Sequence, residues 1–200
     1  GYASREAVSA RRQRLDRRAR RVYVRAVWLD EVAELALRKQ EMLASIPAVQ
    51  PIANLELDHI ASGFVMRMHP IFKIIKFHAG LDFAASTGTE VHATGDGKVT
   101  FADYNTSGFG NHVVIDHGFD LETLYAHLDV IKVHSGEHVK RGDVIGLVGN
   151  TGLSAAPHLH YEVHKDGEPI DPANFFFNDL TPQDYAALVD RARNATQSFD

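Results

Sequence analysis

The chain has 200 residues, 44% of them hydrophobic and 24% charged, which is enough for one domain with a sizeable core plus appendages. Its charge is uneven: residues 1–47 carry 11 Lys and Arg against 6 Asp and Glu, whereas the remainder carries 10 basic and 20 acidic residues. Because phosphate binding needs clustered Lys and Arg, the acidic remainder argues against nucleic acid as a partner. The absence of cysteine excludes disulfides and thiolate sites, so any zinc must be held by His and carboxylate groups.

Residues 4–46 are predicted to be helical, since no Gly or Pro interrupts them and Ala, Arg, Leu and Glu dominate. Pro47 and Pro51 end the helix and mark a domain boundary, so that residues 1–50 form a helical appendage. A seven-residue spacing of apolar residues suggests a coiled-coil seam. The residues with this spacing are Val8, Leu15, Val22, Leu29, Ala36 and Leu43.

The companion positions of this seam are poor, Arg5, Arg12 and Gln40 among them. The helix therefore pairs weakly with another copy or another helix, or bends back on the body. The basic run from Arg11 to Arg25 allows proximity to an anionic membrane surface, although a solvated helical face explains it more simply.

Residues 51–178 are predicted to form a mainly β domain, because short runs of Val, Ile, Phe and Thr alternate with Gly, Asn and Asp. No helix-length segment separates the runs, which favours antiparallel pairing. The expected strands are 88–92, 97–102, 112–116, 121–128, 143–149 and 160–165. Residues 179–200 complete the chain as a short helix and tail, with the helix over 182–195 and Thr181 as its N-cap.

The segment 157–163 alternates polar and apolar residues, which predicts a strand with His158, His160 and Glu162 on one face. Two His residues on one face of a rigid element can begin a metal site, but a solvated strand with incidental histidines fits this short motif equally well. A second polar strip runs from His78 to Ala84. Read as a strand, it places His78, Gly80 and Asp82 on one face.

The two strips together could hold zinc, since a hydrolytic zinc site needs three protein ligands and a water. His78 and Asp82 would supply two ligands, and either His158 or His160 the third; the spacing leaves these two alternatives open. His127 is a further candidate for a catalytic residue. In a regular strand its side chain would share a face with that of Tyr125.

From about Ile60 to Phe176 the chain resembles the LytM/lysostaphin-type zinc endopeptidases, which cut peptide cross-bridges or stems of bacterial peptidoglycan. Six blocks in the family's order carry the resemblance, which makes it more specific than any single motif. They are Gly63-Phe64 with Arg67-Met68-His69-Pro70, His78-Ala79-Gly80-Leu81-Asp82, Gly110-Asn111 with Ile115-Asp116-His117-Gly118, Tyr125-Ala126-His127-Leu128, Gly149-Asn150-Thr151-Gly152 and Pro157-His158-Leu159-His160.

The resemblance implies an antiparallel β-sandwich or barrel-like catalytic domain of the duplicated hybrid motif type. It implies one zinc ion per chain, with His78, Asp82 and His160 as ligands and with His127 and His158 as catalytic histidines. The resemblance leaves eight histidines in structural roles: His59, His69, His92, His112, His117, His134, His138 and His164.

Two departures from the family pattern are Val65, where many members have Gly, and Ser154-Ala155-Ala156, where many have Ser-Thr-Gly. Neither falls on a ligand, so they bear on substrate fit. The implied substrate is a peptidoglycan peptide, and the implied location is the cell envelope. We find no signal peptide and no apolar run long enough to span a membrane, yet the chain begins with Gly. We therefore expect the natural start, with an anchoring segment, to lie upstream.

Two other functions compete with the endopeptidase. A non-hydrolytic module that binds the cell wall or regulates an amidase could retain the metal site. A phosphocarrier with a similar β-sandwich also uses paired histidines, but it gives no reason for the pairing of His78 with Asp82.

Overall fold

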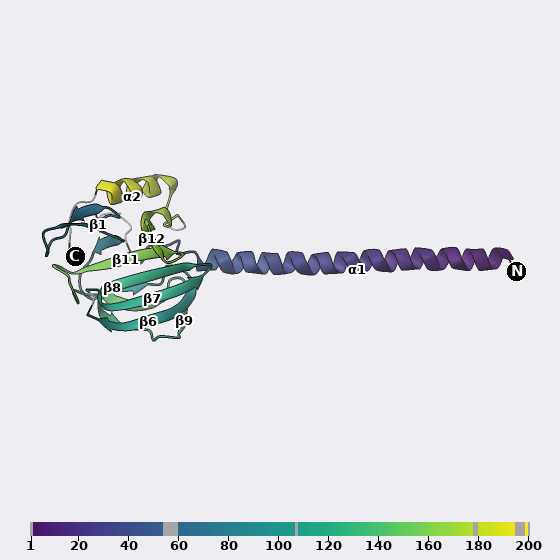
Figure 1. The fold of residues 1–200 in the computed structure, drawn as a ribbon, viewed down its shortest axis with the longest axis horizontal. Helices are drawn as coiled ribbons and strands as arrows, with labels where there is room; N and C mark the ends of the chain where they lie inside the picture. Colours follow the sequence, from purple (N-terminus) through teal and green to yellow (C-terminus); the bar gives the residue numbers. More distant parts are fainter. Residues whose placement is uncertain (1, 54–59, 107, 178–179, 195–198, 200) are drawn as a thin grey trace. The chain divides into compact units, whose positions relative to one another are not determined.

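The computed structural model describes residues 2–53, 60–106, 108–177, 180–194 and 199. The chain divides into two compact units, residues 1–43 and residues 44–200 (Figure 1). The predicted fold class, mainly β and antiparallel with a long N-terminal and a short C-terminal helix, is confirmed.

Helix α1 spans Tyr2–Ser45 and ends just before Ile46-Pro47, because a residue that precedes proline disfavours the helical conformation. The last helical residues, Ala44 and Ser45, already belong to the second unit, and carbonyl groups at this helix end have partners within that unit. The Arg141 guanidinium donates to the carbonyl oxygens of Ala44 and Ile46, each at 2.9 Å.

Large apolar side chains along α1 are exposed, with Val22, Trp28 and Leu35 at 60% or more. These side chains offer an apolar surface for self-association, which stays a prediction. Across the described part of the chain, no helix is both long and apolar enough to cross a bilayer.

In the second unit, the described strands form a ten-stranded antiparallel sheet and a separate two-stranded sheet. The large sheet contains β1 (Ile60–Ser62), β4 (Leu81–Ala84), β5 (Glu90–His92), β6 (Gly97–Asn105), β7 (Gly110–Gly118), β8 (Leu121–Ile131), β9 (His138–Val139), β10 (Val144–Val148), β11 (His158–Lys165) and β12 (Glu168–Ile170). The small sheet pairs β2 (Met66–Met68) with β3 (Ile75–Phe77).

The main path of the large sheet runs β1-β4-β11-β8-β7-β6-β9, and Figure 1 shows β11, β8, β7 and β6 side by side. Strand β8 pairs with β7, and also with both β11 and β10. It pairs with β11 over residues 121–126 and with β10 over residues 128–131. The sheet therefore branches at His127.

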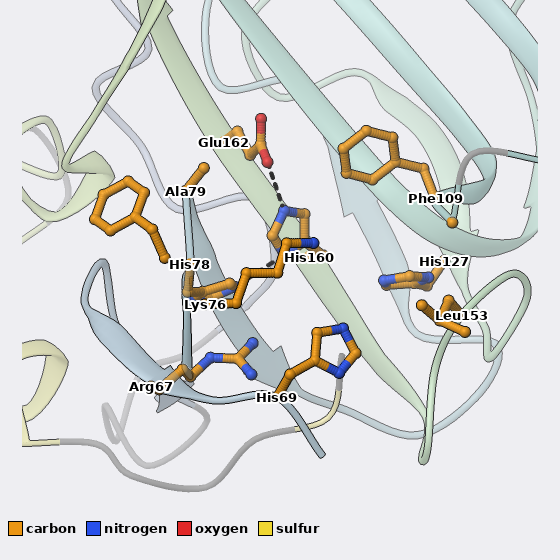
Figure 2. Close-up of a pocket in the computed structure, with 12 residues that line it drawn as sticks. Arg67, His69, Lys76, His78, Ala79, Phe109, His127, Leu153, His160 and Glu162 are labelled. Atoms are coloured by element: carbon orange, nitrogen blue, oxygen red, sulfur yellow. Dashed lines mark hydrogen bonds and ion pairs between the residues drawn. The ribbon is translucent and has the colours of Figure 1, made fainter. Parts of the chain in front are cut away.

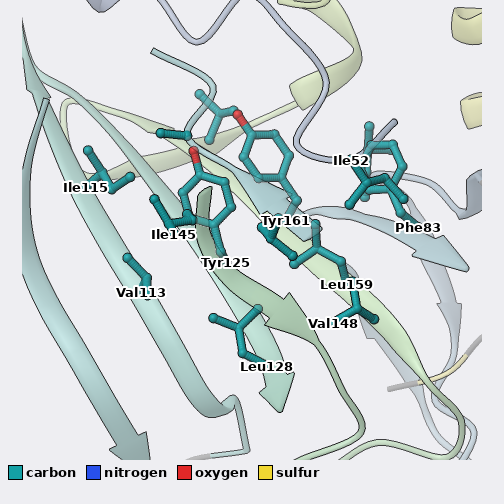
Figure 3. Close-up of a cluster of buried hydrophobic side chains, with 14 of the residues drawn as sticks. Ile52, Phe83, Val113, Ile115, Tyr125, Leu128, Ile145, Val148, Leu159 and Tyr161 are labelled. Carbon is teal, nitrogen blue, oxygen red and sulfur yellow. The ribbon is translucent and has the colours of Figure 1, made fainter. Parts of the chain in front are cut away.

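The core lies behind the apolar face of β11, where Leu159, Tyr161 and Val163 are fully buried as the alternation predicts (Figure 3). Tyr161 packs against Tyr125, with ring centroids 5.2 Å apart. Both hydroxyl groups have partners, since the Thr94 hydroxyl lies 2.9 Å from that of Tyr125 and 3.0 Å from that of Tyr161. Burial of these aromatic rings therefore leaves no hydroxyl of the pair without a hydrogen bond.

A short 3-10 helix, Pro172–Asn174, and helix α2, Pro182–Asn194, follow the sheet. Thr181 caps α2 as predicted, because its hydroxyl accepts from the Asp184 backbone N–H at 3.2 Å. The helix packs so closely against Gly63, the residue after β1, that a Cβ there would overlap the Ala192 carbonyl oxygen. The glycine is therefore needed for this contact.

The six predicted strands are present with shifted ends, whereas the short β1, β2, β3, β9 and β12 were not predicted because two or three residues show no periodicity. The prediction of one strand from His78 onward is wrong, since β4 begins only at Leu81. A Cβ on Gly80 would lie 2.4 Å from the Tyr161 carbonyl oxygen and 3.0 Å from His160 Cε1. Gly80 therefore allows the close approach of β11.

Candidate active site

His78 and Asp82 reach the site from one short segment, and His160 reaches it from the neighbouring strand. Asp82 on β4 pairs directly with His160 on β11, so the two side chains project from the same face of the sheet. His78 precedes β4, and its backbone N–H donates to the Val65 carbonyl at 2.9 Å. All three side chains are buried.

Three potential ligand atoms meet at this point. His78 Nε2 lies 3.0 Å from Asp82 Oδ1 and 3.1 Å from His160 Nδ1, and His160 Nδ1 lies 3.0 Å from the same carboxylate oxygen. Figure 2 shows the two imidazoles converging below Glu162. Ligand atoms about 2.0–2.1 Å from a tetrahedral zinc lie about 3.3–3.4 Å apart, so the triangle is close to the size that such an ion requires.

The outer nitrogen of each imidazole decides what the inner one can do. His78 Nδ1 lies 2.7 Å from the Gly63 carbonyl and His160 Nε2 lies 2.9 Å from Glu162 Oε1, and both partners are acceptors. Each outer nitrogen therefore carries the proton, and each inner nitrogen of the neutral ring offers a lone pair. An added proton could bridge only one of the three close pairs, whereas a cation can bind all three, so the donor set fits a divalent metal.

Glu162 is held in its ionised form. Burial raises the pKa of its carboxyl group, but hydrogen bonds from His160 and from His164, the latter at 2.6 Å, outweigh burial and lower the pKa from 4.5 to about 2. The same contact raises the pKa of His164. A carboxylate behind a metal-binding imidazole fixes the ring orientation and raises the basicity of the ligand.

Arg67 on β2 fixes the other oxygen of the proposed carboxylate ligand. Its guanidinium donates to Asp82 Oδ2 at 3.1 Å, and both side chains are almost fully buried. Asp82 therefore presents only Oδ1 to the two histidines. This contact leaves the carboxylate in a geometry suited to binding a metal through one oxygen.

His127 reaches the site through an irregularity in β8. Two residues of β8, Ala126 and His127, lie opposite one residue of β7, His112, between the pairs Leu128–Asn111 and Tyr125–Val113, and His127 has a φ of 62°. This bulge turns the imidazole into the pocket, whereas Tyr125 faces the core. The expectation that these two side chains share a face is therefore wrong, because it assumed a regular strand.

His127 and His158 stand beside the cluster with their rings 4.7 Å apart between centroids. His127 Nδ1 donates to the Thr151 carbonyl at 2.8 Å, and His158 Nδ1 donates to the Ala156 carbonyl at 2.8 Å. In the neutral rings each Nε2 then carries a lone pair. His158 Nε2 lies 3.8 Å from Asp82 Oδ1. Both imidazoles can accept a proton at Nε2 next to the cluster.

The departures from the family pattern lie close to these groups. Ala156 supplies the carbonyl that orients His158, and the Ser154 hydroxyl lies 3.1 Å from the same imidazole nitrogen. The carbonyl of Val65 holds His78. Both contacts use backbone or retained serine atoms, so the substitutions leave them in place.

An open pocket gives access to the cluster, and the two-stranded sheet forms one of its walls. Arg67, His69 and Lys76 line this wall, while Phe109, His127 and Leu153 lie across from it (Figure 2). Among the histidines expected to be structural, His69 lines the pocket and His164 supports Glu162, whereas His59 lies outside the described residues.

Sequence reasoning gave no role to Arg67, Lys76 or Glu162. The alternation that placed Glu162 on the polar face of β11 was a signal for its proximity to His160. No periodic signal marked Arg67 and Lys76, because β2 and β3 have three residues each.

A buried group of two histidines and a carboxylate at an open pocket, with further histidines beside it, is typical of metal-dependent hydrolases. Residues 76–172 match the model of Peptidase family M23. The chain belongs to this family, which confirms the resemblance found in the sequence.

The chain is 47% identical over 113 residues to the peptidoglycan DD-endopeptidase ShyA of Vibrio cholerae. The matched region covers 56% of this chain and 26% of ShyA. It is similar to the crystal structure of a zinc-containing peptidase from Vibrio cholerae, with 44% identity, a TM-score of 0.52 and coverage of 56% and 35%. It is also similar to the catalytic domain of lysostaphin from Staphylococcus simulans, with 30% identity, a TM-score of 0.53 and coverage of 62% and 97%. The chain spans about a third or less of the length of the curated relatives that it matches.

Proposed function

We propose that this chain is a zinc-dependent endopeptidase that hydrolyses peptide bonds in the stems or cross-links of peptidoglycan. The observation that carries the proposal is the meeting of His78 Nε2, Asp82 Oδ1 and His160 Nδ1 within 3.0–3.1 Å of one another, with the two imidazole protons directed outward. Three protein ligands leave a fourth position of a tetrahedral zinc for water. We propose one ion per chain at these residues.

The bound ion would polarise the scissile carbonyl and make water a nucleophile near neutral pH. Asp82 and the two histidines would hold the ion, and Glu162 and Arg67 would keep His160 and Asp82 in their binding geometry. These outer contacts also keep the ligands in the protonation states that metal binding needs.

His127 and His158 are the proposed proton-transfer pair. Because each Nδ1–H is donated to a backbone carbonyl, each Nε2 can accept a proton from the attacking water and return it to the leaving amine. In its protonated form, either imidazole can donate to the oxygen that becomes negative as the carbonyl is attacked. We assign both roles to the pair together, since both rings have the same tautomer.

We further propose that the protein works in the cell envelope, outside the cytoplasm, where its substrate lies. The support is the similarity to peptidoglycan DD-endopeptidases such as ShyA. Proximity of the basic part of α1 to a membrane, or pairing of α1 with a second copy, remains part of this proposal. The exposed apolar side chains of the helix favour pairing.

The test is digestion of purified peptidoglycan by zinc-loaded wild type and by the His160→Ala and His127→Ala variants. We expect loss of peptide cross-links with the wild type only, reduced zinc content in His160→Ala and near-stoichiometric zinc in His127→Ala. Mass spectrometry of the products would identify the bond cleaved.

Equal activity in all three proteins would overturn the proposal. A folded, zinc-loaded wild type that binds peptidoglycan or an amidase without cleavage would instead identify a non-hydrolytic module. Zinc near one per chain would count against the phosphocarrier reading, which needs no metal.

A further inference from the structure

Two cations lie directly opposite each other at the edge of the pocket. Arg67 on β2 pairs in register with Lys76 on β3, so their side chains project from the same face of the small sheet. Both side chains line the pocket. Like charges at directly opposed positions destabilise a sheet, so this arrangement needs compensation by an anion.

Only one of these cations has a carboxylate partner in the described structure. Arg67 is buried and bonded to Asp82, as described above. Lys76 is exposed, and no carboxylate of the described residues lies within ion-pair distance of its ammonium group. Figure 2 shows its side chain extending from β3 across the pocket toward His160.

The acidic groups around the pocket are already engaged. Glu162 lines the pocket, but its two oxygens accept hydrogen bonds from His160 and His164 at 2.9 and 2.6 Å. Asp82 is fully buried beneath the pocket floor. The ammonium group of Lys76 is therefore the charge that an incoming ligand meets.

We propose that Lys76 determines substrate specificity by binding a carboxylate of the substrate next to the scissile bond. The inference rests on the proposed function and narrows it to anionic peptides. The preferred substrate is a cross-linked stem peptide with a free carboxylate beside the cleaved bond, rather than a bridge of uncharged residues. A charge-assisted hydrogen bond at the pocket edge would also orient the peptide relative to the metal site.

The test uses two synthetic cross-linked muropeptides that differ only in one group beside the scissile bond, a free carboxylate or its amide. We expect zinc-loaded wild type to cleave the acid form with about fivefold higher kcat/KM, the size expected for a partly exposed ion pair. Lys76→Met should bring the ratio close to one, because kcat/KM falls more for the acid form than for the amide form. Lys76→Arg should retain most of the preference.

Lys73→Met is the matched control. Lys73 is exposed on the same hairpin but does not line the pocket. Its substitution by Met removes the same charge as Lys76→Met. This variant should keep the wild-type ratio, which separates direct contact from the general field of the protein. A ratio near one in wild type, or a preference that survives in Lys76→Met, would overturn the proposal.

Binding provides a second readout that does not depend on cleavage. The Kd values of both muropeptides for the zinc-loaded His127→Ala variant, with and without Lys76→Met, should show the same preference and the same loss. If wild type cleaves neither muropeptide nor peptidoglycan, the proposed function fails. The Kd ratio then still decides the role of Lys76, with equal Kd values contradicting it.

Discussion

The two faces of strand β11 both carry buried polar groups, but they use them in opposite ways. On the core face, the hydroxyl of Tyr161 is paired with that of Thr94, which also serves Tyr125. On the pocket face, the inner nitrogens of His78 and His160 lie next to the Asp82 carboxylate, and in the neutral rings all three groups are hydrogen-bond acceptors. Neighbouring residues of one strand therefore belong to a closed network and to an open one.

This comparison distinguishes a structural polar cluster from a functional one. In the core, donors and acceptors match, so the network stabilises the fold without any added group. At the pocket, the outer contacts with Gly63 and Glu162 fix the protons away from the centre, so the cluster is completed by a cation. Changes on the two faces should consequently separate stability from activity.

The largest effect is expected from Asp82→Asn. The amide cannot supply the charge that offsets the metal and Arg67, so zinc affinity and kcat/KM should both fall, the latter by about a thousandfold or more. Zinc content and the loss of peptide cross-links would be measured together. Full zinc content with wild-type activity would show that the open cluster is not a metal site.

Glu162→Gln should have a smaller effect on the same face. Removal of the carboxylate behind His160 is expected to weaken zinc binding by about 10–100-fold, because the ring loses the acceptor that fixes its tautomer. Competition with a chelator measures this change. Glu122→Gln, an exposed carboxylate on the neighbouring strand β8, is the control and should leave zinc affinity unchanged.

Tyr161→Phe tests the core face. Loss of its hydroxyl should lower the free energy of unfolding by about 1 kcal/mol, because one buried hydrogen bond disappears. Urea denaturation measures this change, while zinc content and kcat/KM should stay at wild-type values. A loss of zinc without a loss of stability would show that the two faces are not independent.

The smallest effect concerns His117, at the far side of the closed network. Burial lowers the pKa of His117 below its usual 6.5, and its ring lies 2.8 Å from both the Asp96 carbonyl and the Thr123 hydroxyl. The unfolded chain therefore takes up a proton at a higher pH than the folded chain. Stability is fully present above pH 6.5 and falls as the pH drops toward the lower folded pKa.

His117→Gln should remove this contribution, since glutamine does not titrate. The stability difference between pH 7.5 and pH 5.5 should then be smaller in the variant than in wild type, by at most about 1.4 kcal/mol per pH unit. Thermal unfolding at both pH values measures it. An identical pH dependence in the two proteins would contradict a lowered pKa for His117.

The sequence predicted much of the fold because its strands are long enough to show a pattern. Residues 97–102, 121–128 and 160–165 fall inside observed strands, and the cap at Thr181 follows from local hydrogen bonding. Periodicity also placed His158, His160 and Glu162 on one face of a strand. Patterns of this kind reflect local backbone geometry, which does not need the rest of the chain.

Other features of the site depended on contacts between distant segments. The turn of His127 into the pocket depends on a bulge where β8 changes its partner from β11 to β10, and the alternation of the sequence carries no sign of it. The contact of Arg67 with Asp82 and the opposition of Arg67 to Lys76 depend on a two-stranded sheet too short to predict.

By itself, the sequence determined the antiparallel class and the residue types available for a cysteine-free metal site, since composition and short-range periodicity are local properties. Only the tertiary structure decided which nitrogens of His78 and His160 face Asp82, because hydrogen-bond partners from other segments set each imidazole tautomer. The register of β4 against β11 brought these side chains together, and register is a property of paired strands, not of either strand alone.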